Sequence, residues 1–163
     1  MDMQHKSMPH SMPMNSKMYK KLGLMILVSF AAMYILMYSM VDSFSDSVPN
    51  INQFYMAGLM TMPMLILELL IMGGMYMNKK LNTILIAVGF IGLVGFFFCI
   101  RQQAGVGDRQ FLKSMIPHHG AAILMVEKAS LTDPEVKKLG EGIIAAQQAE
   151  ILQMKAKLTA LNK

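Results

Sequence analysis

The sequence predicts an all-α protein with three transmembrane helices followed by an antiparallel helical hairpin outside the cytoplasm. Hydrophobic residues make up 54% of the 163 residues and charged residues only 15%, which is too apolar a balance for an ordinary soluble domain. Three apolar runs are each long enough to cross a bilayer. After the third run, apolar residues recur at helical spacing in two stretches joined by a short turn.

Changes in composition divide the chain into four parts. In chain order they are a Met/His-rich tail expected to be disordered (1–21), a three-helix transmembrane domain (22–100), a linker (101–107) and a helical-hairpin domain (108–163). The predicted spans cover residues 22–41, 54–77 and 81–100. The first span is longer than the apolar region of a signal peptide and lacks an Ala-x-Ala cleavage site, so we expect it to be retained as a helix.

The distribution of basic residues predicts the orientation of the spans. The segment between the first two spans has no Lys or Arg, whereas the tail carries four Lys and the turn before the third span carries Lys79 and Lys80. The positive-inside rule places the tail and this turn in the cytoplasm. Three crossings then place residues 108–163 in a periplasm or extracellular space, as expected for a protein of a bacterial cytoplasmic (inner) membrane.

Residues that favour helix starts predict the bounds of the two hairpin helices. Asp108 is expected to cap a first helix that runs to about residue 130. Asp133-Pro134-Glu135 is expected to begin a second helix that runs to about residue 161, because Pro and an acidic residue both favour a helix start. Two helices joined by a short turn form an antiparallel hairpin.

Heptad-like spacing predicts one buried seam on each hairpin helix. The first seam comprises Phe111, Met115, His118, Ala122, Met125 and Ala129, and the second comprises Val136, Gly140, Ile143, Gln147, Glu150 and Met154. His119 is displaced from the first seam onto a flank. Pro117 is expected either to kink the first helix or to mark its boundary. Glu150 on an apolar seam needs a partner, either a metal ion or an imidazole.

The His118-His119 pair is the strongest functional signal. The chain has 20 Met and only four His, and every His lies close to Met. Thioether and imidazole together favour a soft metal ion, Cu(I) above all, with Ag(I) or Cu(II) as further candidates. The candidate metal ligands are His118, His119, Met115, Met125, Glu150 and Met154, with Gln147 and Asp108 as supporting residues. The methionines are also acceptable as core packing, and Glu150 is equally suited to holding a His tautomer.

These residues resemble the CopM-type copper-binding family, small ferritin-like helical proteins long catalogued as a domain of unknown function. The resemblance covers about residues 108–158 and implies a periplasmic four-helix domain that binds copper and supports copper tolerance. This chain differs from the secreted members in having three spans and only one hairpin. Because one hairpin buries little surface, we expect a homodimer or higher oligomer in which paired hairpins complete a four-helix bundle.

Two further groups of residues are candidates for soft-metal binding. The tail group comprises Met1, Met3, His5, Met8, His10, Met12 and Met14, and the intramembrane group comprises Met60, Met64 and Glu68. A carboxylate within a span is expensive, so Glu68 is expected to face protein or a polar cavity. Gly89, Gly92 and Gly95 favour close packing of the third span.

The expected function is copper binding outside the membrane, for buffering, tolerance or hand-over to an efflux pump or a cuproenzyme, without catalysis. The alternatives are a copper-transporting channel that uses the Met-rich spans and a purely structural oligomerisation module. A di-iron oxidase is disfavoured because the chain has no Glu-x-x-His pair. No Arg-rich stripe indicates nucleic acid, and a lone Cys99 excludes an intrachain disulfide.

Overall fold

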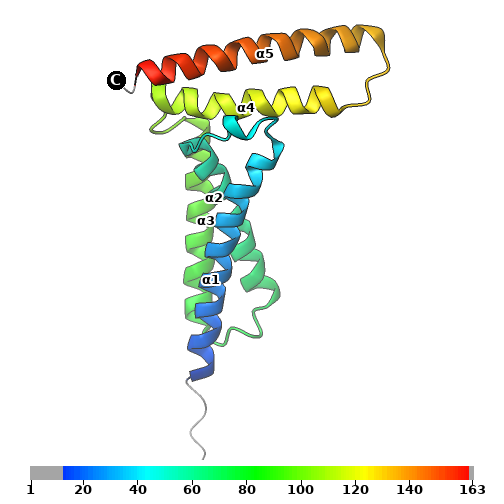
Figure 1. Ribbon diagram of the computed structural model, residues 1–163. Helices are drawn as coiled ribbons and strands as arrows, with labels where there is room; N and C mark the ends of the chain where they lie inside the picture. The colour runs from blue at the N-terminus through cyan, green and yellow to red at the C-terminus, as the bar shows by residue number, and fades with distance from the viewer. Residues whose placement is uncertain (1–12, 162–163) are drawn as a thin grey trace, which may run out of the picture.

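The computed structural model describes residues 13–161, and these residues form an all-α fold (Figure 1). In chain order the elements are α1 (Pro13–Leu36), the 3₁₀ helices η1 (Met37–Met40) and η2 (Phe44–Asp46), α2 (Ile51–Ile71), α3 (Lys79–Arg101), α4 (Asp108–Lys128) and α5 (Pro134–Ala160). Helices α1, α2 and α3 run side by side, and α4 and α5 lie across one end of them (Figure 1). The predicted helical hairpin is therefore present.

Three of the helices are long and apolar enough to cross a membrane, as the sequence predicts: Ser16–Met40, Ile51–Ile71 and Lys79–Arg101. The boundaries differ most from the prediction at two ends. Helix α1 begins at Pro13 and so includes part of the segment assigned to the tail. Helix α2 ends at Ile71 rather than at residue 77, because Gly73 and Gly74 follow its C-cap, Met72, and glycine disfavours helix.

Side-chain caps fix the starts of three helices. The side chains of Asn50 and Asn78 accept backbone N–H groups at the starts of α2 and α3, and Asp133 does the same for α5. The prediction for Asp108 was wrong. The cap of α4 is Gly107, and Asp108 is the first residue inside the helix, where its carboxylate still suits the positive end of the helix dipole.

Close packing between α2 and α3 depends on glycine. A Cβ atom added at Gly89 would lie 2.7 Å from Cγ1 of Ile66, and one added at Gly92 would lie 2.7 Å from Sδ of Met62. Such contacts are too short for any larger residue, which confirms the predicted close packing at these two positions. Gly95 has no atom within 4 Å of an added Cβ, so the prediction does not hold there.

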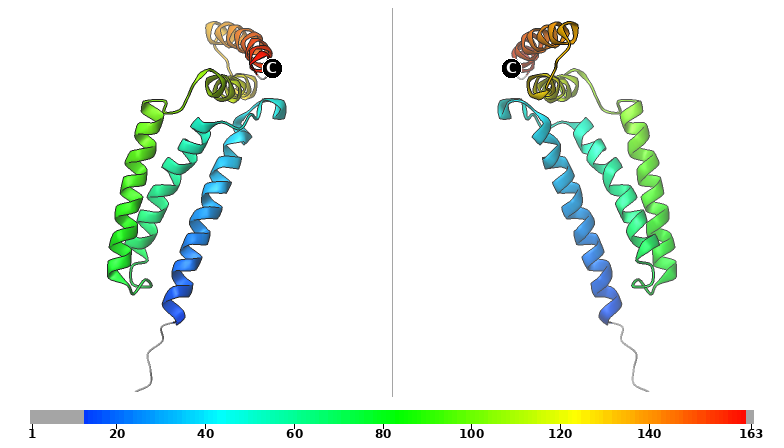
Figure 2. Two further views of the ribbon diagram at one scale, coloured as in Figure 1. Left: turned by 90° about the vertical axis from the view of Figure 1, so that its left-hand side faces the viewer. Right: turned by 90° about the vertical axis from the view of Figure 1, so that its right-hand side faces the viewer.

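The hairpin is held against the end of the spans by the segment 41–50, which connects α1 to α2 (Figure 2). The N–H of Asp42 donates to the carbonyl of Gly120 at 3.2 Å. Asp46, only 7% exposed, forms an ion pair with Lys155 of α5. The side chain of Gln110 also accepts the N–H of Ile51 at 3.2 Å. Both hairpin helices are therefore tied to the end of the helical bundle.

The predicted seam of α4 was wrong. The buried residues of this helix are Ile116, Pro117, His119, Gly120 and Ile123, whereas Phe111, His118 and Met125 are exposed. Helix α4 packs against α5 on one side and against segment 41–50 on another, and the face between these contacts carries Ile116 and Ile123. Burying these branched aliphatic side chains gains more than burying a histidine. Pro117 lies inside an uninterrupted helix, so it does not mark a boundary.

The predicted seam of α5 is largely confirmed. Gly140 is buried, and Ile143, Gln147 and Met154 are half-buried. Two residues are exceptions. Val136 is 45% exposed, and Ile151, rather than its neighbour Glu150, is the buried residue in that turn of the helix. Ile151 joins Ile116 and Ile123 in the hairpin core, against which Val48, Met154 and Leu158 pack.

Candidate metal centre in the helical hairpin

His119 joins the two hairpin helices through both of its ring nitrogens. Nδ1 lies 2.9 Å from the carbonyl oxygen of Met115, one turn earlier on α4. Nε2 lies 2.7 Å from Oε2 of Glu150 on α5. A carbonyl and a carboxylate can only accept, so the ring donates through both nitrogens when both bonds form. The bond to Glu150 is then a charge-assisted hydrogen bond across the hairpin.

This arrangement gives the two ring nitrogens different roles. The bond to the Met115 carbonyl fixes the ring and keeps the proton on Nδ1, which is the usual second contact of a metal-ligating histidine. Nε2 points toward α5, where a metal ion would replace its proton. The side chain of His119 is only 11% exposed, whereas the side chain of Glu150 is 53% exposed. Glu150 is therefore the partner free to move when Nε2 binds a ligand.

Two methionines lie one helical turn from this pair. Met115 precedes His119 by four residues on α4, and Met154 follows Glu150 by four residues on α5; both are half-buried. Gln147 is half-buried on the same face of α5. The thioethers thus lie near the only imidazole–carboxylate pair among residues 13–161. Their chemistry, with a neutral imidazole, suits a soft metal ion.

The remaining hairpin candidates lie away from the pair. His118 is exposed, and Met125 is 60% exposed. Asp108 lies at the start of α4, about 16 Å along the helix from His119. Within residues 13–161, no three His, Cys, Asp or Glu side chains come together as a metal site. One chain therefore provides an imidazole–carboxylate pair with nearby thioethers, and a closed ligand set needs a rearrangement or a second chain.

An open stripe runs along α4 beside this pair. We define the open stripe as Phe111, Met115, His118, Ala122 and Met125, the residues that share one face of the helix. Phe111 is 52% exposed, and Met115 and Ala122 are half-buried. The open stripe is an apolar surface with a histidine at its centre.

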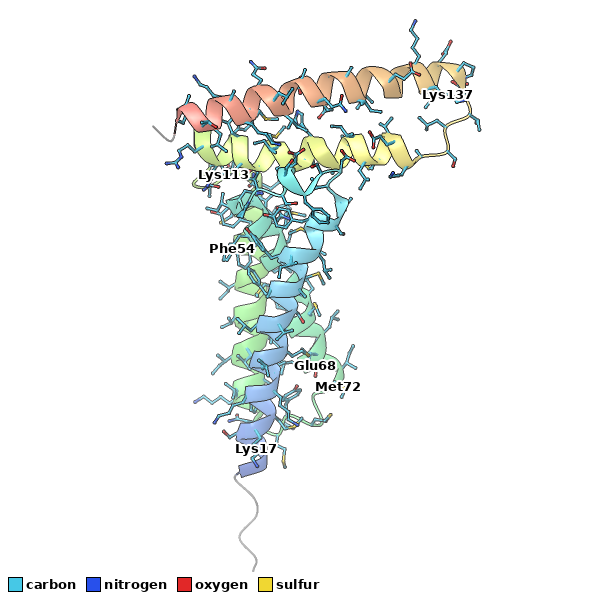
Figure 3. The ribbon with its side chains drawn as sticks, in the orientation of Figure 1. Lys17, Phe54, Glu68, Met72, Lys113 and Lys137 are labelled. Atoms are coloured by element: carbon cyan, nitrogen blue, oxygen red, sulfur yellow. The ribbon has the colours of Figure 1, made fainter. Side chains whose placement is uncertain are left out.

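The intramembrane candidates lie far from the hairpin. Glu68 falls in the last turn of α2, toward the Lys17 end of the molecule (Figure 3). Its carboxylate accepts a hydrogen bond from the hydroxyl of Tyr76 at 3.0 Å, so Glu68 faces protein as expected. Burial, and then this bond, raise the pKa of Tyr76. Met60 is 42% exposed and Met64 half-buried.

The tail candidates cannot be placed. Met1, Met3, His5, Met8, His10 and Met12 lie outside the described residues, as does the side chain of Met14.

Comparison with known proteins identifies the family. Residues 72–161 match the family described as "Domain of unknown function (DUF305)". The chain belongs to the DUF305 family. It is also 34% identical over 134 residues to "Uncharacterized protein L153" of Acanthamoeba polyphaga mimivirus, an alignment that covers 80% of this chain and 86% of that protein. No solved structure matches the chain.

The DUF305 segment is larger than the hairpin. Residues 72–161 include α3 and the linker as well as α4 and α5, so the family unit contains one of the three apolar helices. The His119–Glu150 pair lies within the DUF305 segment. Asp46, which holds Lys155, lies outside it.

The clamp between Asp46 and Lys155 was missed by sequence reasoning. The only local signal is that Asp46 belongs to a short segment without Lys or Arg. A carboxylate that becomes buried in such a segment needs a cation from elsewhere in the chain. The sequence does not indicate that this cation comes from α5, 109 residues later.

Proposed function

We propose that this DUF305 protein is a membrane-anchored copper-binding protein of the CopM type. It binds Cu(I), and also Ag(I) or Cu(II), on the hairpin outside the cytoplasmic membrane, and it buffers the ion or hands it on without catalysis. The observation that carries the proposal is the fixed orientation of His119. Its Nδ1 is held by the Met115 carbonyl at 2.9 Å, which leaves Nε2 as the ligating atom.

The residues around His119 fit a soft metal ion. Nε2 supplies imidazole, Met115 and Met154 supply thioether sulfur from adjacent turns, and Glu150 supplies a mobile carboxylate. This donor set favours Cu(I) and Ag(I) over harder ions. Glu150 either joins the metal or loses its hydrogen bond to the ring when the metal displaces the proton on Nε2.

A second copy of the chain completes the domain. The open stripe presents His118 and Met125 on an apolar surface next to the His119–Glu150 pair. Pairing two such faces gives a four-helix bundle of two hairpins, the arrangement in which facing helices commonly build metal sites. A homodimer thereby adds His118 and Met125 to the ligands provided by one hairpin.

The apolar helices anchor the hairpin in a bilayer. The exposed lysines of α1 and the Lys79–Lys80 pair lie at one end of the spans, and the hairpin lies at the other. By the positive-inside rule the lysine end faces the cytoplasm and the hairpin faces the periplasm or the exterior. A copper efflux pump or a cuproenzyme at the same membrane is the proposed recipient.

The test is an anaerobic Cu(I) titration of the full chain in mild detergent against a chromogenic Cu(I) chelator. The variant His118→Ala/His119→Ala removes both hairpin histidines. The matched control, His5→Ala/His10→Ala, removes the same number of histidines from the tail. We expect the first variant to lose tight binding and the second to retain it.

Other outcomes favour the alternatives. Binding that is lost only in His5→Ala/His10→Ala would assign copper to the tail. Binding that survives both double variants but is lost in Met60→Leu/Met64→Leu/Glu68→Gln would favour a channel through the spans. Absence of tight binding by the unmodified chain would leave the hairpin as a structural oligomerisation module.

A further inference from the structure

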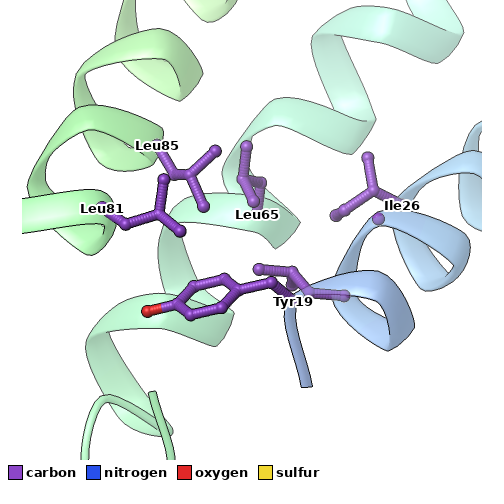
Figure 4. Close-up of a pocket in the computed structure, with 7 residues that line it drawn as sticks. Tyr19, Ile26, Leu65, Leu81 and Leu85 are labelled. Atoms are coloured by element: carbon purple, nitrogen blue, oxygen red, sulfur yellow. The ribbon is translucent and has the colours of Figure 1, made fainter. Parts of the chain in front are cut away.

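An apolar groove separates α1 from α3 near the lysine end of the spans. It encloses about 370 Å³ and is lined by Leu22, Gly23 and Ile26 of α1, Leu65 of α2, and Leu81 and Leu85 of α3. Figure 4 shows Leu65 of α2 and Leu81 and Leu85 of α3 across the groove from Ile26 and Tyr19 of α1. Apart from the tyrosine hydroxyl, the lining side chains are hydrocarbon.

The polar end of the groove is closed by Tyr19. Its hydroxyl donates to the side chain of Asn82 and also lies 3.2 Å from the carbonyl oxygen of Asn78. These bonds tie the first turns of α1 to the start of α3. Lys20 follows Tyr19 in the sequence and Lys80 precedes Leu81, and both Tyr19 and Leu81 line the groove.

The two lysines are exposed beside an apolar groove. Among residues 13–161, neither forms an ion pair; the two ion pairs that form are His119–Glu150 and Lys155–Asp46. The nearby carboxylate, Glu68, is hydrogen-bonded by Tyr76. The groove therefore has an almost entirely hydrocarbon lining, and the residues next to Tyr19 and Leu81 in the sequence, Lys20 and Lys80, carry positive charges without an ion pair.

We propose that this groove binds one acyl chain of an anionic phospholipid, with the phosphate between Lys20 and Lys80. The inference depends on the proposed membrane insertion and is independent of copper. In a bilayer an apolar groove is filled by lipid or by another helix. Basic pockets between helices at the cytoplasmic side suit anionic headgroups.

A helix from a second copy fits the groove less well. Helices approach each other closely through small residues, but near the lining residues Ile26 and Leu85 in the sequence α1 and α3 carry the bulky Leu27, Ile84 and Val88, each about half exposed or more. A second copy would also bring its own lysines to the same level, where like charges repel. An acyl chain is thin enough to enter the groove, and an anionic headgroup neutralises the lysines.

Gly23 provides a sharp test, because an added Cβ meets no atom within 4 Å and would point into open space. Gly23→Phe is expected to place its ring in the groove. The matched control is Gly95→Phe, since Gly95 also has nothing within 4 Å and lies in an apolar helix outside the groove. The full chain is stripped of lipid in detergent and mixed with phosphatidylglycerol or phosphatidylcholine, and bound lipids are counted by native mass spectrometry.

We expect the unmodified chain and Gly95→Phe to retain phosphatidylglycerol in preference to phosphatidylcholine, and Gly23→Phe to lose the bound lipid. Lys20→Gln/Lys80→Gln should bind both lipids equally, whereas Lys137→Gln/Lys138→Gln, which removes the same charge from α5, should keep the preference. If Gly23→Phe loses its helical circular dichroism, the smaller Gly23→Leu is compared instead.

Equal lipid binding by the two phenylalanine variants would overturn the inference and indicate lipid held only around the outside of the bundle. A lipid-free dimer that dissociates in Gly23→Phe would assign the groove to a second copy. Extraction of the chain from membranes by alkaline carbonate would contradict both the proposed membrane anchoring and this inference. Retention in the membrane without bound phosphatidylglycerol would contradict this inference alone.

Discussion

The Nε2 atom of His119 lies 2.7 Å from Oε2 of Glu150, so the buried imidazole of α4 is held by a half-exposed carboxylate of α5. With Nδ1 also facing an acceptor, the ring has no free lone pair in this arrangement. A metal ion that bound at Nε2, as we propose, would have to displace the proton on this atom. Metal affinity and proton binding would then be linked at this one atom.

Metal binding should release roughly one proton for each ion bound at His119. Calorimetric titration of the full chain with Ag(I), which needs no reductant, in two buffers of different ionisation enthalpy measures this release. The apparent enthalpies should differ between buffers for the unmodified chain and agree for His119→Ala. Agreement in the unmodified chain would contradict ligation by the imidazole.

Acid should weaken the same binding. Between about pH 8 and about pH 5, protons compete increasingly for imidazole, whereas thioethers do not titrate in this range. The dissociation constant measured by chelator competition should rise as the pH falls, and a weak residual affinity from methionine should remain. In His118→Ala/His119→Ala this pH dependence should disappear; its persistence there would point to ligands elsewhere.

Breaking the Asp46–Lys155 ion pair should loosen the hairpin. Lys155→Met leaves the buried Asp46 carboxylate without its cation, which should destabilise the docked state by about 1–3 kcal/mol. Hydrogen exchange of residues 41–50 should become faster. The double variant Asp46→Asn/Lys155→Met should recover part of the loss, because it removes the buried charge as well. Unchanged exchange in Lys155→Met would show that the pair contributes nothing to docking.

Gly120 should tolerate no side chain. The Cβ of Gly120→Ala would lie 2.8 Å from Cγ1 of Val41, and a valine side chain is too stiff to move aside easily. Overpacking of this kind should cost about 1–3 kcal/mol. The control Gly142→Ala, where an added Cβ meets nothing within 4 Å, should instead stabilise α5 by up to about 1 kcal/mol. Thermal unfolding followed by circular dichroism compares them, and equal melting temperatures would refute the close contact.

The orientation of the spans can be read from cysteine labelling. In a Cys99→Ser background, Lys137→Cys on α5 should react with a membrane-impermeant maleimide in intact cells. Lys79→Cys, at the other end of the spans, should react only after the cells are opened, because the positive-inside rule places it in the cytoplasm. The opposite labelling pattern would invert the proposed topology and turn the hairpin toward the cytoplasm.

The fold followed from the sequence wherever a local signal was sufficient. Span number followed from hydropathy and length, and the start of α5 followed from Asp133 and Pro134. The rotation of α4 did not follow, because it depends on a long-range contact: Gly120 meets segment 41–50. No residue near His118 in the sequence indicates that α4 packs against segment 41–50 as well as against α5.

The sequence predicted what kind of partner Glu150 needs but not which histidine provides it. Glu150 was expected to need an imidazole or a metal ion, and it does hydrogen-bond an imidazole. The histidine is His119 rather than the residue placed on the seam. Periodicity gives the relative positions of residues around a helix, whereas the face that turns inward is decided by all of its neighbours.

Helix α5 is attached on two sides. Glu150 holds His119 of α4, while Lys155 holds Asp46 of the segment between α1 and α2. These two residues are about 140° apart around the helix axis. A rolling motion of α5 that moves Glu150 away from the imidazole therefore turns Lys155 as well. A ligand that displaced Glu150 from His119 by rolling α5 would therefore also disturb the ion pair that connects α5 to the segment between α1 and α2.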